Sequence, residues 1–251
     1  MASSRRPASP IAILVDVSAA RTPQASVRKA VARLLLICHA DSVRESRSCS
    51  MCLSRKVATT GLNRLIAMMT PNSMDATFRG LTDPRRQLSG TGLSSALVIE
   101  DRHELLVGPK HPLADAPSVT PRQLADHPIW MPGLPSGDEV AAYYAEVGAT
   151  FGITLDVLGP AFGAEVLMTE IADSATLANL VGEGSRYLWP AHYDLRRIPI
   201  VDPTPVFPLW VIWRTNNRQP DLAELLAFLK ADFAGRQSSD RWRPSWARHG
   251  H

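Results

Sequence analysis

The stretch ELLVGPKHPLA, residues 104–114, opens with an apolar strand candidate over residues 104–107. A second strand candidate, Leu93 to Ile99, precedes it, and four polar residues, EDRH at positions 100–103, separate the two. Because polar residues between two apolar runs are typical of a solvated turn, we expect the two strands to be joined there. Downstream, Thr120-Pro121 predicts a helix start, with Thr as the N-cap and Pro at the first helical position.

Short helices and apolar strands alternate on both sides of this stretch. Upstream, apolar residues at helical spacing predict a helix over residues 62–69, which Pro71 ends, and a strand follows at 74–78. This alternation indicates an α/β domain with a largely parallel sheet. Downstream, the same patterns predict strands at 129–131, 155–158, 176–181, 198–201 and 207–213, and helices around 143–151, 165–172 and 220–235.

The composition is that of a globular chain. It has 251 residues, of which 45% are hydrophobic, enough for one larger domain or two small lobes with a sizeable core. Three cysteines are too few for a disulfide scaffold, and no apolar run reaches the ~18 residues needed to cross a bilayer. The run Ile11 to Val15 follows two arginines, but it is short and Asp16 breaks it, so we expect a cytoplasmic chain with no secretory signal and no membrane partner.

Residues 1–60 differ in composition from the rest. They hold ten Lys or Arg against three acidic residues, whereas the remainder holds 17 against 21. No aromatic residue precedes Phe78, and aromatic side chains dominate core energetics, so we expect a basic, poorly ordered or atypical segment. Helical spacing over residues 23–39 raises a DNA-binding interpretation, but the Ser/Arg-rich residues 41–55 show no second helix to support it.

Motifs for metal binding and catalysis are weak or missing. Cys49 and Cys52 form a C-x-x-C with Cys38 and His39 upstream, but an adjacent Cys-His couple cannot place both side chains on one ion without strain. The sequence contains no glycine-rich phosphate loop, no G-x-S-x-G and no H-E-x-x-H. We therefore predict no metal, no cofactor and no catalytic residue.

Three turn-rich segments are expected at the edge of the sheet where ligands bind, namely residues 132–137, 159–163 and 173–175. In open α/β sheets, ligands bind outside the carboxyl ends of the strands. Each segment offers backbone N–H groups to a small ligand, the first and the last also offer a hydroxyl, and the last two flank a helix whose N-terminus favours an anion.

Several motifs in the right order resemble the effector-binding domain of LysR-type transcriptional regulators. The stretch at 104–114 looks like that family's strand and His-Pro-Leu-Ala crossover, and VTPRQLADHPI at 119–129 looks like its next helix and strand. Residues 171–181 stand in the place of its helix end, glycine turn and strand, with Ser174 where glycine is usual. The other similar segments are residues 74–78, 195–203, 208–214 and 221–229, so the resemblance covers about residues 61–234.

The resemblance implies a two-lobed α/β domain of the type II periplasmic-binding-protein-like fold, which binds a small-molecule effector between its lobes. The implied effector domain covers residues 61–235, with a first lobe of about 61–108 plus 206–235 and a second of about 109–205. Residues 236–251 are expected to be a disordered tail with Trp242 and Trp246 exposed. Family ligands contact the loops that match the three turn-rich segments, so the expected ligand-binding residues are Pro132, Gly133, Ser136, Phe162, Gly163, Asp173, Ser174 and Thr176.

Within this set, we expect Ser136 and Thr176 to donate hydroxyl hydrogen bonds and Phe162 to form an apolar wall. Family members also carry an N-terminal helix-turn-helix and a linker helix, which residues 1–60 do not resemble, and an opening strand and helix, to which Ile11 to Val17 and the following helix are only a weak match. The resemblance therefore implies a ligand-sensing regulator that self-associates and whose first lobe is incomplete. It would contact DNA only through the basic segment or an upstream module. The alternatives are a solute-binding protein of the same fold and a non-functional regulator remnant.

Overall fold

A computed structural model describes residues 76–134, 137, 139–159, 164–183, 191–236 and 238–248. The helix expected at 62–69 and the segment 1–60 lie outside these residues. The strands are β1 (Ala76–Arg79), β2 (Leu93–Val107), β3 (Ile129–Trp130), β4 (Leu155–Asp156), β5 (Ala178–Gly182), β6 (Arg196–Pro199), β7 (Thr204–Arg214) and β8 (Arg241–Trp242). The helices are α4 (Pro84–Gln87), α5 (Pro121–Leu124), α6 (Glu139–Phe151), α7 (Ala164–Asp173) and α8 (Pro220–Gly235), with 3-10 turns at Ala191–Tyr193 and Ser245–Ala247.

The residues EDRH at 100–103 are the middle of one long strand, so the prediction of a solvated turn there was wrong. β2 runs without interruption for 15 residues from Leu93 to Val107. Its first part pairs antiparallel with β7, as far as Arg102 opposite Val206. From His103 onward it pairs antiparallel with β5 instead, and from Glu104 also with β6. The polar residues therefore mark the place where β2 changes neighbours.

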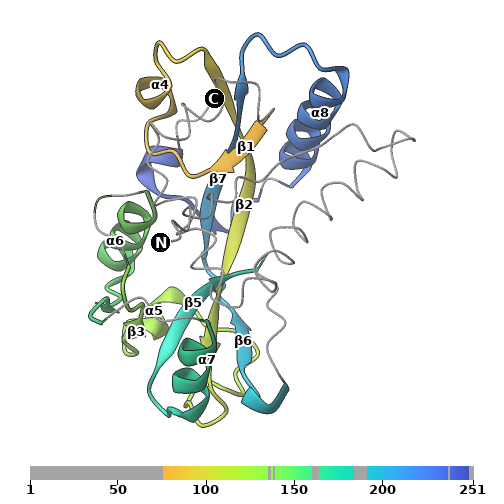
Figure 1. Ribbon diagram of the computed structural model, residues 1–251. Helices are drawn as coiled ribbons and strands as arrows, with labels where there is room; N and C mark the ends of the chain where they lie inside the picture. The colour runs from red at the N-terminus through yellow and green to blue at the C-terminus, as the bar shows by residue number, and fades with distance from the viewer. Residues whose placement is uncertain are drawn as a thin grey trace, which may run out of the picture.

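This change of neighbours divides the eight-stranded sheet into two parts (Figure 1). β7 pairs with the first part of β2 and β1 pairs with β7, whereas β5, β6, β3 and β4 belong to the second part. We call the first part, with α4 and α8, the first lobe, and the second part, with α5, α6 and α7, the second lobe. Among the strands that the structure describes, only the pairs β3–β4, β3–β5 and β7–β8 are parallel. The sheet is therefore mixed rather than largely parallel, because β2 runs against each of its three neighbours.

Local sequence explains where several elements begin. Thr120 caps α5 as predicted: its hydroxyl accepts a hydrogen bond from the Gln123 N–H while the Gln123 side chain accepts from the Thr120 N–H, which is a capping box. Pro220 stands in the first turn of α8, where its missing N–H costs no helical hydrogen bond. β7 is buried along most of its length, as its nearly continuous apolar sequence predicts.

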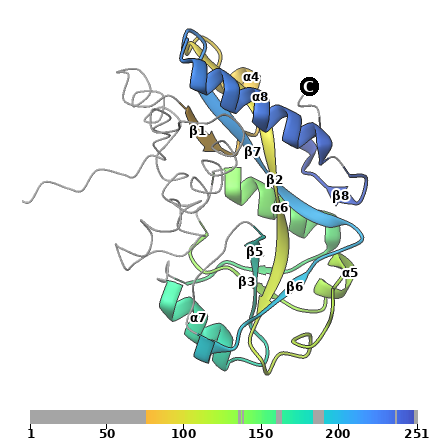
Figure 2. The ribbon, with the colours of Figure 1, turned by 90° about the vertical axis from the view of Figure 1, so that its right-hand side faces the viewer.

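Each lobe has its own core. The larger core belongs to the second lobe and gathers the inner faces of β2, β3, β5 and α6, with Leu105, Ile129, Tyr143 and Val147 almost fully buried. In the first lobe, α8 packs Leu222, Leu225 and Leu229 against β1, β2 and β7. Figure 2 shows α8 lying along the β2–β7 pair on one side of the molecule. None of the helices that the structure describes combines the length and apolarity needed to span a bilayer.

The C-terminal tail is ordered over residues 238–248, so the expectation of a disordered tail with exposed tryptophans was wrong. The side chain of Trp242 is 7% exposed and belongs to the larger core, and Trp246 packs against two of the cores. The tail lacks hydrophobic periodicity because it forms a two-residue strand and one 3-10 turn, which are too short to show any period.

Candidate functional site

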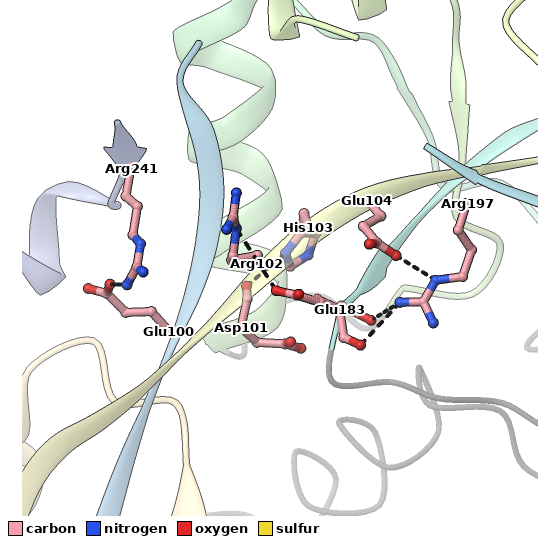
Figure 3. Close-up of polar contacts among 9 residues, drawn as sticks. Glu100, Asp101, Arg102, His103, Glu104, Glu183, Arg197 and Arg241 are labelled. Atoms are coloured by element: carbon pink, nitrogen blue, oxygen red, sulfur yellow. Dashed lines mark hydrogen bonds and ion pairs between the residues drawn. The ribbon is translucent and has the colours of Figure 1, made fainter. Parts of the chain in front are cut away.

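The junction of the two lobes is crossed by the polar middle of β2. Figure 3 shows how the side chains of residues 100–104 lie along the strand, with ion pairs from Glu100 to Arg241, from Arg102 to Glu183 and from Glu104 to Arg197. Because successive side chains of a strand point to opposite faces, neighbouring residues in this run reach different partners. No functional site was predicted at this run of residues.

Glu100 holds two arginines from the C-terminal tail. Its side chain is 1% exposed and lies 2.7 Å from Arg241 Nη1. Arg243 donates through both Nε and Nη2 to the same carboxylate, the latter at 3.0 Å. A buried carboxylate needs such charged partners, because an isolated charge in the interior is very costly.

His103 is a neutral core residue at the first pair between β2 and β5. It is 4% exposed, and its Nε2 lies 2.9 Å from the hydroxyl of Tyr144 on α6. Burial lowers the pKa of His103 from 6.5 to about 4, which outweighs the contact with the Asp101 carbonyl that raises it. The imidazole is therefore uncharged at neutral pH and packs against Tyr143, with ring centroids 5.1 Å apart.

Glu104 and Arg197 join three strands on the second-lobe side of the junction. Arg197 Nε lies 2.5 Å from Glu104 Oε2, which links β6 to β2. The same guanidinium donates from Nη2 to the backbone carbonyls of Gly182 and Glu183 at the end of β5. Both side chains are roughly one-fifth exposed, and the pair fixes the end of β5 at the junction.

One buried ion pair connects the two lobes directly. Arg79, at the end of β1 in the first lobe, reaches Glu139, the first residue of α6 in the second lobe. Arg79 Nε lies 2.6 Å from Glu139 Oε1 and Nη2 lies 3.2 Å from Oε2, and the side chains are 5% and 9% exposed. The lack of a side chain at Gly80 allows this approach, since a Cβ there would lie 2.9 Å from Glu139 Cγ and from Phe207 Cζ.

A buried hydroxyl lies one helical turn from Glu139. Tyr143 is fully buried, yet its hydroxyl has no hydrogen-bond partner among the residues that the structure describes. Burial raises the pKa of Tyr143 well above its usual value, and the charges of Tyr144 and Asp101 raise it further. Glu139 and Tyr143 are four residues apart on α6, so they share one helix face.

The structure separates the predicted ligand-binding residues into two groups. Pro132 and Gly133 follow β3 at its carboxyl end, and the Gly133 N–H donates to the Val157 carbonyl, so this loop lies at the expected edge. Their contact with a ligand stays a prediction. Ser136, Phe162 and Gly163 lie outside the described residues.

The turn of Asp173, Ser174 and Thr176 lies at the opposite edge, so its expected place at a carboxyl end was wrong. It precedes β5, which is parallel to β3 with Ala178 opposite Ile129. In Figure 1 it is at the end of α7 farthest from the junction. The Ser174 hydroxyl accepts hydrogen bonds from the Thr176 and Leu177 N–H groups, which caps the turn itself.

The junction residues were missed because their partners are far apart in the sequence. Arg79 and Glu139 are 60 residues apart, and Glu100 and Arg241 are 141 apart. One local signal was present for β2: the run at 100–103 contains no Gly, Pro, Asn or Ser, and Asp101 is its single common turn residue.

Comparisons with known proteins agree with this architecture. The family model described as the LysR substrate binding domain matches residues 56–234. No curated sequence matches the chain significantly. Among solved structures, full-length BenM matches with a TM-score of 0.52 at 16% identity, covering 69% of this chain and 55% of that one. The chain thus spans about half the length of that protein.

Two further structures have the same fold. The BenM effector binding domain with its effector benzoate matches with a TM-score of 0.53 at 15% identity, covering 72% of this chain and 81% of that one. CbnR, a LysR family transcriptional regulator, matches with a TM-score of 0.52 at 15% identity, covering 68% and 56%. These likenesses show the two-lobed periplasmic-binding-protein-like fold. Because the family model covers well over half of the sequence, the chain belongs to the LysR family through its substrate binding domain.

Proposed function

We propose that this chain senses a small anionic metabolite, which it binds at the lobe junction between Arg79 and the N-terminus of α6. The observation that carries the proposal is the buried Arg79–Glu139 ion pair. Ligand binding there would change the contact between the lobes, and a ligand shifts a conformational equilibrium only through such differential contacts.

The ion pair itself supports a binding role. Burying two charges costs so much desolvation that an apolar pair of the same size stabilises a fold at least as well. Arg79 and Glu139 join different lobes, so the pair responds to any change in their separation. An ion pair at this place is therefore better suited to a switch than to stability alone.

The local charges favour an anion. The N-terminus of α6 carries the positive end of the helix dipole, and the Arg79 guanidinium faces its first residue. A carboxylate is the natural bidentate partner of a guanidinium, and the Glu139 carboxylate already occupies that position. A ligand carboxylate would take its place, with the buried hydroxyl of Tyr143 one turn away as a further donor.

The test is a thermal melt of the chain with a panel of carboxylate metabolites, starting from benzoate, and with benzamide as the uncharged analogue. A ligand at 100 times its dissociation constant stabilises the folded state by about 2.7 kcal/mol, which raises Tm by several degrees. We expect at least one carboxylate to raise Tm and its amide not to. If no anion in a broad panel shifts the melt, the proposal is wrong.

Three variants locate the site. Glu139→Gln removes the competing carboxylate, so it should bind the same anion more tightly, whereas Arg79→Met should abolish binding. Thr176→Val is the matched control, since that residue lies at the far edge of the second lobe and should leave the affinity unchanged. Tighter binding by Arg79→Met, or loss of binding in Thr176→Val alone, would place the ligand elsewhere.

Membership of the LysR family supports the rest of the proposed biological role. We propose that ligand binding regulates transcription, in the cytoplasm and through a homo-oligomer, without catalysis. DNA contact would then come from the basic residues 1–60 or from another module. DNA binding through basic residues weakens steeply with salt, so a binding constant that does not change between low and high salt would exclude it.

A further inference from the structure

The chain continues past the last helix into a segment that contacts both lobes. Residues 240–247, which we call the C-terminal segment, lie beyond residue 234, where the match to the family model ends. β8 pairs in parallel with the start of β7, placing Trp242 opposite Pro205, and the Thr204 N–H donates to the Asp240 carbonyl at 2.8 Å. The segment is therefore fixed at the point where β7 enters the junction.

Its last two residues, Trp246 and Ala247, are anchored in the first lobe. The ring of Trp246 stacks on Trp210 of β7, with centroids 5.9 Å apart and an angle of 29° between the planes. Ala247 is 3% exposed and belongs to a core cluster with Leu81 and Leu88, which flank α4. These contacts bury the end of the segment against first-lobe residues.

Trp242 and Ser245 anchor the segment in the second lobe. The ring of Trp242 packs against Tyr143 and Phe151 of α6, with centroid distances of 6.0 and 5.3 Å. The backbone N–H and the hydroxyl of Ser245 both donate to the Glu146 carboxylate of the same helix, the hydroxyl at 3.1 Å. The segment thus contacts α6 between Tyr143 and Phe151, while Arg79 contacts the first residue of the same helix.

The middle of the junction supplies a third anchor. Glu100 of β2 is nearly inaccessible and holds both Arg241 and Arg243. These two arginines flank Trp242 in the sequence, so the carboxylate fixes the backbone from which the indole enters the core. The segment cannot leave the junction without exposing Trp242 and separating these charges.

From these contacts we infer that the C-terminal segment is a brace between the lobes, which holds α6 against β7 and limits the movement of one lobe relative to the other. Its anchors are Trp242 and Ser245 on the second lobe, Trp246 and Ala247 on the first, and the Glu100 clamp at the junction. Release of the brace would free α6, and with it Glu139, to move away from the first lobe. The inference rests on the two-lobed fold and not on the identity of any ligand.

The test is hydrogen–deuterium exchange of the full chain without ligand, for the wild type and for Trp242→Ala and Ser245→Ala. Ser245→Ala removes the hydroxyl hydrogen bond to Glu146 and keeps the one from the backbone N–H. Because Ser245 is exposed, the substitution leaves no cavity in the core. The control is Trp213→Ala, which removes a partly buried indole from the α8 side of the first lobe. For Trp242→Ala we expect exchange in residues 139–151 to rise by about tenfold while β1 and the β2–β7 pairs keep their rates. Ser245→Ala should shift the same peptides by a smaller factor.

A purely stabilising tail would behave differently. Removing a contact from such a tail would raise exchange in both lobes together. Trp213→Ala should show this uniform rise in all peptides other than those that contact Trp213. Uniform acceleration in Trp242→Ala, or no selective change in α6 for either brace variant, would overturn the inference. Small-angle scattering adds a second readout, because release of the brace should increase the radius of gyration of Trp242→Ala and leave that of Trp213→Ala unchanged. If Trp242→Ala does not fold, Ser245→Ala alone decides between the two.

Discussion

The ion pair between Arg79 and Glu139 makes a quantitative prediction about stability. The two side chains are 5% and 9% exposed and are joined by two short contacts, so removing either one leaves the other charge buried. Breaking a buried pair in this way costs about 3–5 kcal/mol. For a domain of this size, 1 kcal/mol corresponds to about 2–4 °C in Tm, so Arg79→Met should lower Tm by roughly 10 °C.

The double variant separates the interaction from the two side chains. Arg79→Met combined with Glu139→Leu removes both charges and fills similar volume, so it should recover most of the loss, to within about 1 kcal/mol of the wild type. Since each single variant should cost at least about 3 kcal/mol and the double variant about 1 kcal/mol, the coupling free energy from the four-member cycle should be at least about 5 kcal/mol. Urea unfolding followed by tryptophan fluorescence measures all four proteins, with the m-value as a check on two-state behaviour.

The control is an exposed pair at the C-terminal end of α8. Arg236 and Asp232 lie 2.9 Å apart, but the arginine is 69% exposed, so Asp232→Asn should change stability by less than about 0.5 kcal/mol. If Glu139→Gln costs no more than this control, or if the effects of Arg79→Met and Glu139→Leu simply add, the two charges do not depend on one another. Either result would refute the reasoning that makes this pair the link between the lobes.

Two further predictions concern single residues. Because burial lowers the pKa of His103 to about 4, the unfolded chain binds more protons below pH 6.5, and stability should fall by roughly 3 kcal/mol between pH 6.5 and 4. His103→Gln should flatten the fall in stability with pH, leaving a smaller fall from His111, whose pKa is lowered mainly by burial and also by His127. The control is a substitution of an exposed histidine, His192→Gln. An equal dependence of stability on pH in the two variants would contradict the assignment to His103. Gly108→Ala should lower the free energy of unfolding by about 1–3 kcal/mol, because a Cβ there would lie 2.3 Å from the Ile171 carbonyl oxygen. The control is Gly235→Ala, whose Cβ would meet nothing within 4 Å. If chemical denaturation finds Gly108→Ala as stable as the wild type, α7 is not packed so closely on the end of β2.

Elements whose signals are local were predicted well. The N-cap at Thr120 depends on Pro121 and Gln123 alone, and the amphipathic helix α8 is indicated by the spacing of its own leucines. The order of short helices and strands was also sufficient to identify the family, which the match over residues 56–234 confirms. These features depend on neighbours within a few residues in the chain.

Features that depend on distant partners could not be predicted in this way. The charged run at 100–103 is a strand because Glu100 meets arginines of the tail and His103 meets Tyr144 of α6, and no local pattern reveals either partner. The indole of Trp242 is buried for the same reason, since the surface it fills is made by α6. The turn at 173–176 was assigned to the wrong edge because its position depends on the direction in which β5 enters the sheet.

The most direct test of ligand binding at the lobe junction is hydrogen–deuterium exchange with and without benzoate, or with whichever carboxylate gives the largest shift in Tm. We expect protection in β1 and in the first turns of α6, around Arg79 and Glu139, with no change in residues 173–176 at the far edge. The same footprint should be lost in Arg79→Met. Protection confined to the far edge of the second lobe, or protection that survives in Arg79→Met, would show that the ligand binds elsewhere.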